Sequence, residues 1–387
     1  MNAIDASSVF NVKPEERISL SALLDVVRER RVEFTRAQQV APDVVELMRR
    51  AGIFRALVAR RFGGDEMTPA EFIQIIEQIA VVDGSAAWVA SFGHASAYIA
   101  ALPVATLERI YENGPDVSVC GALFPPHNAK AVDGGLEVSG RWKFGSGTST
   151  ADLVGVGIKA EGVDDGGAPR MALMPRDKVT IVPNWDVNGL CGTGSHDVVV
   201  DKVVVPVEWT FIRGSAANLD GPLFRYPVMA LAAQVLAVVG LGVARSALDT
   251  LIEMAGGRGS ITGAPVLANR AYVQSEVAQA EAALRSARAF FYDAAEDAYA
   301  TLVAGEPLPL DKVNLLRLSS THLARVGVDV AQTAYRLSGT AAIYTDHPIA
   351  RQFNDALVVA QHAFLSTGTW QSAGQILLGL ESPPGFP

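Results

Sequence analysis

The sequence is short of cysteine and of charged residues, and these shortages narrow the classes of protein it can be. Only two of its 387 residues are cysteines, Cys120 and Cys191. Two cysteines cannot build a disulfide framework, which indicates a reducing compartment. Charged side chains make up 19%, and the formal net charge is −9 at pH 7. A nucleic-acid partner normally requires a basic face, so this class of partner is disfavoured.

No segment has the pattern of a targeting signal or a membrane span. Residues 1–17 lack the apolar core that follows a basic start in a secretory signal. The most apolar long stretch, residues 228–251, contains Gln234, Arg245 and Asp249. These polar residues favour a buried helix over a membrane-spanning one. We therefore expect a cytoplasmic protein that does not bind membranes.

Apolar material is plentiful. Hydrophobic residues make up 49% of the chain, and the mean hydropathy is +0.23. A chain of this length can bury a large interior, and the excess of apolar surface suggests that subunit interfaces are buried as well. We expect an oligomer, and a homotetramer in particular.

The pattern of the first part of the chain is helical. Between residues 18 and 110 the apolar side chains recur at helical spacing. Thr68-Pro69-Ala70-Glu71 has the form of a capping box with proline at the first helical position, which predicts a helix start. Asp83-Gly84-Ser85 is predicted to end that helix and to begin another, which carries Trp88, Phe92, His94 and Tyr98.

The pattern then becomes β-rich and afterwards helical again. Residues 117–211 contain short β-rich runs between turn signals, with no spacers of helix length, which predicts an antiparallel sheet or small barrel. Four long helical patterns follow, at 228–255, 264–304, 310–337 and 349–378. They predict a four-helix bundle. We expect a multi-layer α+β chain with domains at residues 1–115, 116–215 and 216–387.

One motif resembles a nucleotide-binding fingerprint without being one. The segment from Val238 to Ala244 contains Gly240 and Gly242, the spacing of the first two glycines of a dinucleotide-binding loop. The third glycine is missing, and the flanking pattern is helical throughout rather than strand, turn and helix. We interpret these small residues as helix-packing positions.

Three segments resemble the acyl-CoA dehydrogenase superfamily, as does the order of a helical domain, a β-domain and a helical bundle. Residues 54–87 resemble the family's first-domain signature, and residues 140–147 resemble its flavin-covering strand. Residues 189–197 resemble its GLRGTGS-D turn, with Cys191 where a basic residue is common. The resemblance covers nearly the whole chain and implies the acyl-CoA dehydrogenase fold.

Two branches of that superfamily differ in the residues that carry their chemistry. A dehydrogenase needs a carboxylate base beside the substrate thioester. Asp346, in the stretch before Pro348, is the nearest carboxylate here, and it is one methylene shorter than the usual glutamate. The flavin-dependent monooxygenases of group D, which include p-hydroxyphenylacetate hydroxylase, dibenzothiophene monooxygenase and indole-type enzymes, carry instead an aspartate followed by a histidine. Asp355 and His362 match that pattern.

The resemblance to the monooxygenase branch implies roles for three residues. His362 and His94 fall where that branch has its two active-site histidines, and Ser146 falls where a hydroxyl bonds flavin N5. Imidazole near neutral pH can act as base or acid. We therefore predict His362, His94 and Ser146 as catalytic, and Phe92, His94 and His362 as substrate-binding.

The same resemblance implies a set of cofactor-binding residues. Those predicted are Trp142, Phe144, Ser146, Gly147, Arg258, Gly339 and Thr340. The remaining histidines show no metal-ligand spacing, so no metal site is predicted. No nucleophile elbow of the Ser-His-Asp type is present either.

The residues that depart from the family pattern bear on the substrate. Gly121 lies in a loop where some hydroxylases use a serine to bind a phenol, and Gly145 replaces a second common serine. A less polar ring than a phenol, such as an indole or another heteroaromatic, is therefore favoured.

The resulting hypothesis is a two-component monooxygenase. A separate flavin reductase would supply reduced FAD or FMN, and the chain would use O₂ to hydroxylate a small aromatic or heteroaromatic substrate. Two alternatives stay open at this point: an acyl-CoA dehydrogenase that holds FAD and uses Asp346, and a non-catalytic member of the fold that acts as a binding subunit.

Overall fold

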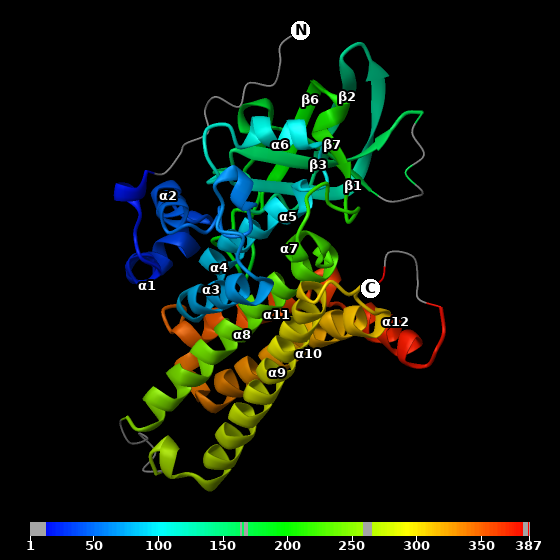
Figure 1. The fold of residues 1–387 in the computed structure, drawn as a ribbon. Helices are drawn as coiled ribbons and strands as arrows, with labels where there is room; N and C mark the ends of the chain where they lie inside the picture. Colours follow the sequence, from blue (N-terminus) through cyan, green and yellow to red (C-terminus); the bar gives the residue numbers. More distant parts are fainter. Residues whose placement is uncertain (1–12, 163–164, 166–168, 258–264, 382–385, 387) are drawn as a thin grey trace. The chain divides into compact units, whose positions relative to one another are not determined.

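The computed structural model describes residues 13–162, 165, 169–257, 265–381 and 386 (Figure 1). The chain forms two compact units, each assembled from separate parts of the sequence. Unit 1 comprises Met1–Phe72, Val89–Asp186 and Cys191–Met229. Unit 2 comprises Ile73–Trp88, Val187–Leu190 and Ala230–Pro387. The division into three sequential domains at residues 1–115, 116–215 and 216–387 remains a prediction.

Unit 1 begins with two helices that have clear local signals. The side chain of Ser19 caps α1 (Leu20–Ala37) by accepting a hydrogen bond from the Ala22 N–H at 3.2 Å, and Gln38 ends the helix in the left-handed conformation. Proline occupies the first position of α2 (Pro42–Arg50), where the missing N–H is not needed. Shorter helices follow: α5 (Ala95–Ile99), α6 (Val104–Ile110) and α7 (Pro222–Arg225).

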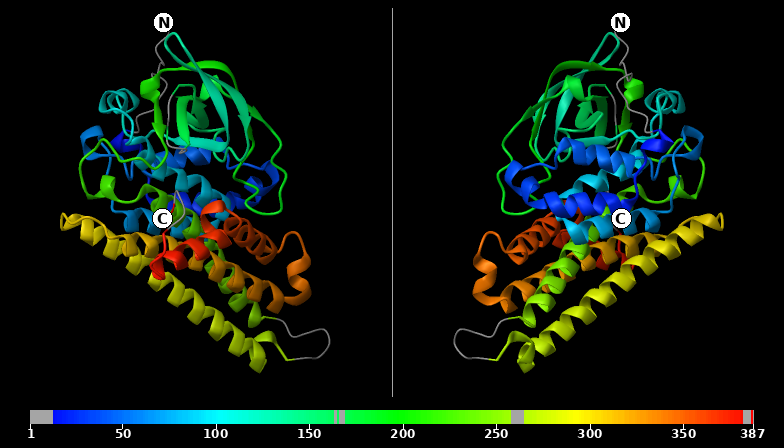
Figure 2. Two further views of the ribbon diagram at one scale, coloured as in Figure 1. Left: turned by 90° about the vertical axis from the view of Figure 1, so that its right-hand side faces the viewer. Right: turned by 90° about the vertical axis from the view of Figure 1, so that its left-hand side faces the viewer.

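All strands that the structure describes belong to unit 1 and form one seven-stranded sheet (Figure 2). The strands are β1 (Val119–Val132), β2 (Gly135–Trp142), β3 (Leu153–Ala160), β4 (Arg170–Pro175), β5 (Thr180–Val182), β6 (Asp197–Val205) and β7 (Thr210–Ile212). Their order across the sheet is β5-β6-β2-β1-β3-β4-β7. Strands β1 and β2 form a hairpin across Asp133-Gly134, as the turn signal predicted.

One pair of strands corrects the prediction of an antiparallel sheet. Strands β1 and β3 run parallel, with Val119 opposite Leu153, while the other neighbouring pairs are antiparallel. After the hairpin turn, strand β2 runs antiparallel to β1, and the loop at residues 143–152 leads from its end to the start of β3. Strand β3 therefore starts beside the first residues of β1 and must run in the same direction.

Asp152 fastens the start of this parallel pair. Its Oδ2 accepts hydrogen bonds from the Ser118 N–H at 2.7 Å and from the Ser118 hydroxyl at 2.8 Å. The buried guanidinium of Arg49, on α2, pairs with the same carboxylate at 2.9 Å. A carboxylate that is neutralised and accepts several hydrogen bonds is well suited to a partly buried position.

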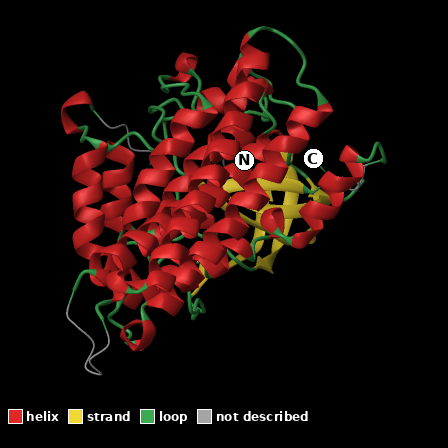
Figure 3. Ribbon diagram, turned by 90° about the horizontal axis from the view of Figure 1, so that it is seen from below, coloured by secondary structure: helices red, strands yellow, loops and turns green. Residues whose placement is uncertain are grey.

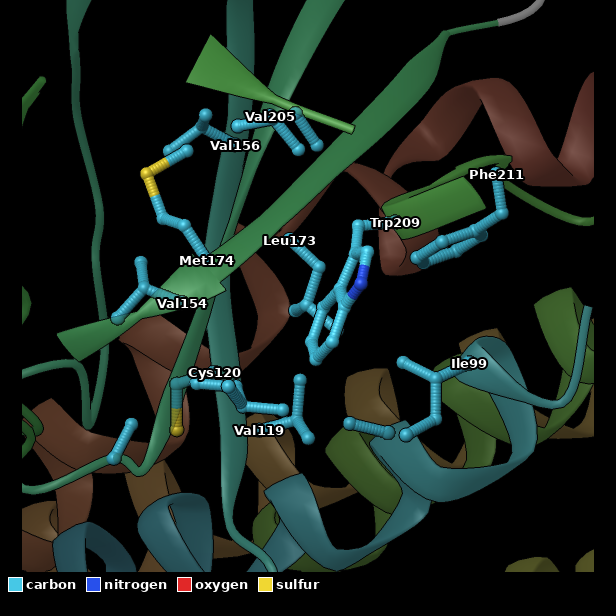
Figure 4. Close-up of a cluster of buried hydrophobic side chains, with 14 of the residues drawn as sticks. Ile99, Val119, Cys120, Val154, Val156, Leu173, Met174, Val205, Trp209 and Phe211 are labelled. Carbon is cyan, nitrogen blue, oxygen red and sulfur yellow. The ribbon is translucent and has the colours of Figure 1, made fainter. Parts of the chain in front are cut away.

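The main hydrophobic core of unit 1 lies between the sheet and the short helices. Figure 4 shows Trp209 and Leu173 packed together with Phe211, and Ile99 of α5 facing them from the helix side. Trp209 and Trp142 have no exposed surface, and Leu173 is also fully buried. Burial of this much apolar area is the main favourable contribution to the stability of the unit.

Unit 2 is helical (Figure 3). Its elements are α3 (Pro69–Val82, shared with unit 1), α8 (Val228–Ala255), α9 (Ala271–Val303), α10 (Leu310–Leu337), α11 (Pro348–Ala360) and α12 (Thr367–Leu377). Helix α10 packs against α9, α11 and α12. The patterns at 228–255 and 310–337 predicted the bounds of α8 and α10 correctly.

Local signals at the start of α3 act as the sequence predicted. The Glu71 N–H donates to the Thr68 hydroxyl at 3.2 Å, and the Glu71 carboxylate accepts from the Thr68 N–H at 2.8 Å. This reciprocal pair is a capping box. Helix α4 (Gly84–Ser91) begins after the predicted break at Asp83, but it ends at Ser91, and η3 (Phe92–His94) separates it from α5. The prediction that His94 and Tyr98 lie on the same helix as Trp88 is therefore wrong.

The predicted last helix at 349–378 is wrong in one respect, because the structure divides it. Helix α11 ends at Ala360, and α12 begins at Thr367. Between them His362 has an extended backbone (φ −62°, ψ 139°) and its side chain accepts a hydrogen bond from the Phe364 N–H. His362 thus caps the short helix η8 (Ala363–Leu365) rather than lying within a long helix.

Helix α8 is mostly buried within unit 2. Among the described residues, α8 alone is long and apolar enough to cross a membrane, but 83% of its most apolar window is buried inside the protein. A Cβ at Gly242 would lie 2.4 Å from the Ala80 side chain and 2.8 Å from the Glu77 carbonyl oxygen of α3. Gly242 therefore allows close packing of α3 on α8, which is the interpretation made from the sequence.

Replacing Gly242 with valine is expected to lower the free energy of unfolding by roughly 2–3 kcal/mol, because the added side chain overlaps α3. Chemical denaturation measures this change. Gly256→Ala is the matched control, since a Cβ at Gly256 meets no atom within 4 Å. Equal stability of the two variants would contradict the close contact between α3 and α8.

Candidate active site

Two turns of unit 1 hold the predicted flavin-facing segment in place. The first turn follows β2 and carries Ser146; the second precedes β6 and carries Ser195. The Gly145 N–H donates to the His196 carbonyl oxygen at 2.9 Å, and the Gly147 N–H donates to the Thr193 carbonyl oxygen at 3.1 Å. Both residues 140–147 and residues 189–197 resembled family signatures, and these bonds join them in space.

Three buried hydroxyls form a chain across the two turns. The Ser146 Oγ lies 2.6 Å from the Ser195 Oγ, which lies 2.7 Å from the Thr193 Oγ1. All three side chains are less than a tenth exposed. The orientation of Ser146 is therefore set by Ser195. Sequence reasoning missed Ser195 and Thr193 as site residues, although both lie within the 189–197 signature that it identified.

The two glycines that replace family serines occupy tightly packed positions. A Cβ at Gly121 would lie 2.3 Å from the Gly155 carbonyl oxygen of the neighbouring strand β3. A Cβ at Gly145 would lie 2.5 Å from the Val198 side chain and 2.9 Å from the His196 carbonyl oxygen. A serine fits neither position without a backbone shift. The packing around Gly121 and Gly145 therefore leaves no space for a serine side chain.

His94 lies at the end of η3 in unit 1 and is buried. Its Nδ1 is 2.6 Å from the Ser91 carbonyl oxygen. Because a carbonyl oxygen can only accept, Nδ1 carries the proton and Nε2 keeps its lone pair in the neutral ring. Burial, assisted by the charge of Arg213 and opposed by the bond to Ser91, lowers the pKa of His94 to about 4. His94 is thus a neutral hydrogen-bond acceptor at physiological pH.

Tyr98 and Arg213 extend the polar surroundings of His94. The Tyr98 ring lies edge-on to His94, with the ring centroids 5.5 Å apart. The Arg213 guanidinium donates to the Tyr98 hydroxyl at 3.1 Å and lies over the Tyr98 ring. Phe92 lies on another side of His94, with a centroid distance of 6.2 Å. Sequence reasoning did not single out Arg213, and no motif marks it.

His362 lies in unit 2 and has the opposite pattern of ring nitrogens. Its Nδ1 accepts from the Phe364 N–H at 3.2 Å, so the neutral ring carries its proton on Nε2. The Trp88 ring lies edge-on to the imidazole at a centroid distance of 5.9 Å, and the Phe364 ring lies at 5.2 Å. His362 is thus held between two aromatic side chains as a hydrogen-bond donor.

The structure divides the predicted catalytic residues between the units. His94 and Ser146 belong to unit 1 and His362 belongs to unit 2. Gly339 and Thr340 lie exposed at the start of η7 (Gly339–Ile343) in unit 2, and Asp346 is exposed before α11. Arg258 lies outside the described residues. The roles assigned to these residues stay predictions.

The segment around Ser146 has features that suit the face of a flavin ring. The Phe144 ring is 67% exposed, and its backbone has a positive φ of 62°, which is uncommon for a bulky residue and marks a local constraint. Gly147 also has a positive φ, and the Ser146 hydroxyl lies between them. Trp142 differs, because it is fully buried and donates its indole N–H to the Gly157 carbonyl oxygen at 2.8 Å. Phe144, Ser146 and Gly147 therefore fit a flavin better than Trp142 does.

Within the described part of the chain, no three His, Cys, Asp or Glu side chains gather in a way that could hold a metal ion. The two cysteines are free thiols, and burial raises the pKa of the Cys120 thiol far above its ordinary value. Cys120 is therefore an inert core residue at neutral pH.

Replacing Ser195 with alanine removes the partner that orients the Ser146 hydroxyl. We expect the free energy of unfolding to fall by about 1–2 kcal/mol, since two buried hydroxyls lose a hydrogen bond. Denaturant titration measures the change. Ser149→Ala, at a half-buried position in the same turn, is expected to stay within about 0.5 kcal/mol of the original protein. A Ser195→Ala protein as stable as this control would argue against the hydroxyl chain.

Comparison with known proteins gives consistent similarities. A family model described as acyl-CoA dehydrogenase, C-terminal domain, matches residues 234–367. An indole-3-acetate monooxygenase of Pseudomonas putida is 52% identical over 370 residues, covering 95% of each chain. A protein of the same name from Acinetobacter baumannii is 44% identical over 96% of each chain.

More distant relatives are also oxygenases. The oxygenase subunit HsaA of a flavin-dependent monooxygenase from Rhodococcus jostii is 27% identical, covering 89% of this chain and 93% of that protein. The crystal structure of 3-HSA hydroxylase from Rhodococcus sp. RHA1 superimposes with a TM-score of 0.86 at 26% identity, covering 94% of this chain and 96% of that one.

These similarities extend over nearly the full length of the chain and agree with the resemblance found in its sequence motifs. Two of the relatives are named indole-3-acetate monooxygenase, and others are named oxygenase subunits or components of flavin-dependent enzymes. The chain therefore belongs to the flavin-dependent monooxygenases of the acyl-CoA dehydrogenase fold, and it is the oxygenase component of a two-component system that hydroxylates an aromatic substrate.

Proposed function

We propose that the substrate is an indole with a carboxylate side chain, of the indole-3-acetate class. Two relatives at 52% and 44% identity bear the name indole-3-acetate monooxygenase. The observation that carries the proposal is the bond between the His94 Nδ1 and the Ser91 carbonyl oxygen. It leaves Nε2 as an acceptor, which suits the N–H of an indole ring.

An acceptor beside the indole N–H also serves the chemistry. Transfer of an oxygen atom to an aromatic ring is favoured when the ring is electron-rich. A hydrogen bond from the ring N–H to the neutral His94 raises the electron density of the ring, and a full proton transfer raises it further. The low pKa of His94, about 4, keeps its lone pair available over the whole neutral range.

His362 is proposed as the complementary donor. The Phe364 N–H donates to its Nδ1, so the neutral ring carries its proton on Nε2 and would donate from that nitrogen. A donor supplies a proton to an oxygen that develops negative charge as a bond breaks. The aromatic rings of Trp88 and Phe364 hold the imidazole plane in place.

The residues proposed to hold the flavin are Phe144, Ser146 and Gly147, with Trp142, Gly339, Thr340 and Arg258 retained from the sequence prediction. When bound, reduced FAD or FMN supplies the electrons that activate O₂. The Ser146 hydroxyl, oriented by Ser195, is proposed to bond the ring nitrogen N5. The exposed Phe144 ring would cover one face of the bound flavin and exclude water.

Arg213 is proposed to bind the substrate carboxylate. It lies close enough to His94 for its charge to lower the pKa of the imidazole. Guanidinium groups bind carboxylates in paired hydrogen bonds. Tyr98, which accepts a hydrogen bond from Arg213, adds a second polar group on the same side of His94.

We propose further that the protein is a cytoplasmic homotetramer. Several large apolar side chains at the C-terminal end of unit 2 are more than half exposed: Ile343, Tyr344, Leu377, Leu378 and Leu380. An apolar surface of this kind supports association between subunits. Light scattering on the purified protein measures its mass directly.

The carboxylate proposal predicts a substrate-dependent loss in Arg213→Gln. With reduced flavin and O₂ supplied, the variant should lose about 10- to 100-fold in kcat/KM for indole-3-acetate, because one charge-assisted interaction is removed. The loss should be small for 3-methylindole, which lacks the carboxylate. Arg36→Gln, at an exposed position of unit 1, is the control. An equal loss with both substrates would contradict carboxylate binding by Arg213.

His94 is predicted to act as a neutral acceptor. His94→Asn, which lacks an atom at the Nε2 position, should lose about 100-fold in kcat/KM, and His94→Gln, whose longer amide reaches that position, should lose less. The folded-state pKa lies below the ordinary value of 6.5, so the unfolded chain binds the proton more readily. Stability should therefore fall as the pH drops from 6.5 towards 4.

Denaturation at several pH values and product assays measure these effects. The His94→Asn protein lacks the titrating ring, so its stability should fall less over the same acid range. A product rate that decreases on acidification with a midpoint near pH 6.5 would contradict the proposal if this pH dependence is absent from the variant. It would show that His94 becomes charged near neutrality.

A further inference from the structure

Two buried carboxyl groups of unit 2 come from distant parts of the sequence and interact through their charges. Asp83 lies between α3 and α4, and Asp355 lies on α11. Their side chains are only 4% and 3% exposed.

Each carboxyl group holds a neighbouring segment of backbone. The Asp83 Oδ1 accepts from the Ala86 N–H at 2.9 Å, which satisfies a free donor in the first turn of α4. The Asp355 Oδ1 accepts from the Leu190 N–H at 2.6 Å. Leu190 has a positive φ of 50°, and this bond helps to hold its unusual backbone conformation.

The other Asp355 oxygen faces the chain next to Asp83. A Cβ built at Gly84 would lie 3.2 Å from the Asp355 Oδ2. The same Cβ would meet the side chains of Val243 and Leu190 at 2.9 Å and 3.3 Å. The surroundings of this oxygen are therefore apolar and closely packed, so water provides little screening.

The charges that act on Asp355 are those of Asp83, from the α3–α4 junction, and of Arg351, from α11 itself. Burial first, and then the charge of Asp83, raise the pKa of Asp355 from 3.8 to about 7, while the Leu190 N–H and Arg351 act in the opposite direction. Two carboxyl groups whose charges repel in a buried site cannot both be ionised at low cost.

We propose that Asp355 is a positioning residue that stays protonated beside Asp83, and that this pair holds α4 and α11 at the spacing that places Trp88 against His362. Trp88 lies on α4, which begins after Asp83, and His362 lies two residues beyond the end of α11. The Trp88–His362 contact joins the same two elements that the carboxyl pair joins. This inference rests on the proposed role of His362 in the hydroxylation.

The sign of the pH effect follows from the raised pKa. The folded-state value lies above the unfolded value, so the neutral carboxyl stabilises the fold at low pH relative to high pH. That contribution is lost as the pH rises from about 4 to about 7. Above this range Asp355 is ionised beside Asp83, and we expect α4 and α11 to separate slightly and the donor His362 to lose its fixed position.

The test compares Asp355→Asn with Asp329→Asn, an exposed position on α10. Asparagine has the shape of a protonated aspartate and keeps an acceptor for the Leu190 N–H. Between pH 4 and pH 8 the folding equilibrium of the original protein should shift against that of Asp355→Asn by up to about 10³-fold. Asp329→Asn should follow the original protein. Absence of this shift would overturn protonation of Asp355.

A second experiment measures catalysis with indole-3-acetate as the substrate. The quantity measured from pH 6 to pH 9 is the amount of hydroxylated product formed per flavin oxidised. This yield should fall above about pH 7 in the original protein and in Asp329→Asn, and should stay level in Asp355→Asn. Identical profiles for all three would overturn the positioning role. If no product forms from any arylacetate, the proposed function fails, whereas the stability arm still decides the state of the carboxyl pair.

Asp83→Asn provides a second variant should Asp355→Asn not fold. It keeps an acceptor for the Ala86 N–H and removes the facing charge. Asp355 should then ionise at lower pH, so the midpoint of the pH-dependent loss of stability should move down. Infrared spectroscopy gives a direct reading, because the stretch of a protonated carboxyl group should be present at pH 6 in the original protein and reduced in Asp355→Asn. An unchanged midpoint and an unchanged infrared band would each overturn the proposal.

Discussion

The position of the loop that carries Ser146 in unit 1 depends on the carboxylate of Asp152. This group accepts two hydrogen bonds from Ser118 and pairs with the buried Arg49, and it thereby fastens the start of β1 to the start of β3. Strand β2 runs back antiparallel to β1, and the loop at residues 143–152 then leads to the start of β3 beside the start of β1, which makes the β1–β3 pair parallel. Ser146 lies in this loop and is brought to Ser195 at 2.6 Å. The strand pairing and the position of the Ser146 hydroxyl have the same cause.

Backbone groups, rather than other side chains, distinguish the two histidines. His94 donates its Nδ1–H to a carbonyl oxygen, and His362 accepts a backbone N–H at its Nδ1. One ring is thereby left with an accepting Nε2 and the other with a donating one. Two residues of the same type therefore present opposite hydrogen-bonding groups in their neutral forms. Backbone packing also determines the residues at positions 121 and 145, because the neighbouring strand and turn leave no room for a hydroxyl group at these glycines.

Much of the fold was predictable from local pattern. The bounds of α8 and α10 followed from apolar spacing, and the capping box at Thr68 started α3 as predicted. The break between α11 and α12 was missed because residues 361–366 contain neither glycine nor proline, and the cap is a histidine, which carries little capping preference. The parallel pairing of β1 with β3 was missed because it depends on where a loop ends in space. Ser195 was missed for a related reason, since its partner lies 49 residues away.

The amino-acid sequence by itself determined the order of helical, β-rich and helical segments, the family resemblance and the identity of Ser146, His94 and His362 as candidates. Such properties follow from residue type and spacing, which are local. Only the tertiary structure decided which nitrogen of each histidine carries the proton, which hydroxyl orients Ser146, and that the charge of Asp83 acts on the buried Asp355. Hydrogen bonding and charge interaction act over a few ångströms in space, and residues separated by hundreds of positions, such as Asp83 and Asp355, acquire their properties only once folding brings them together.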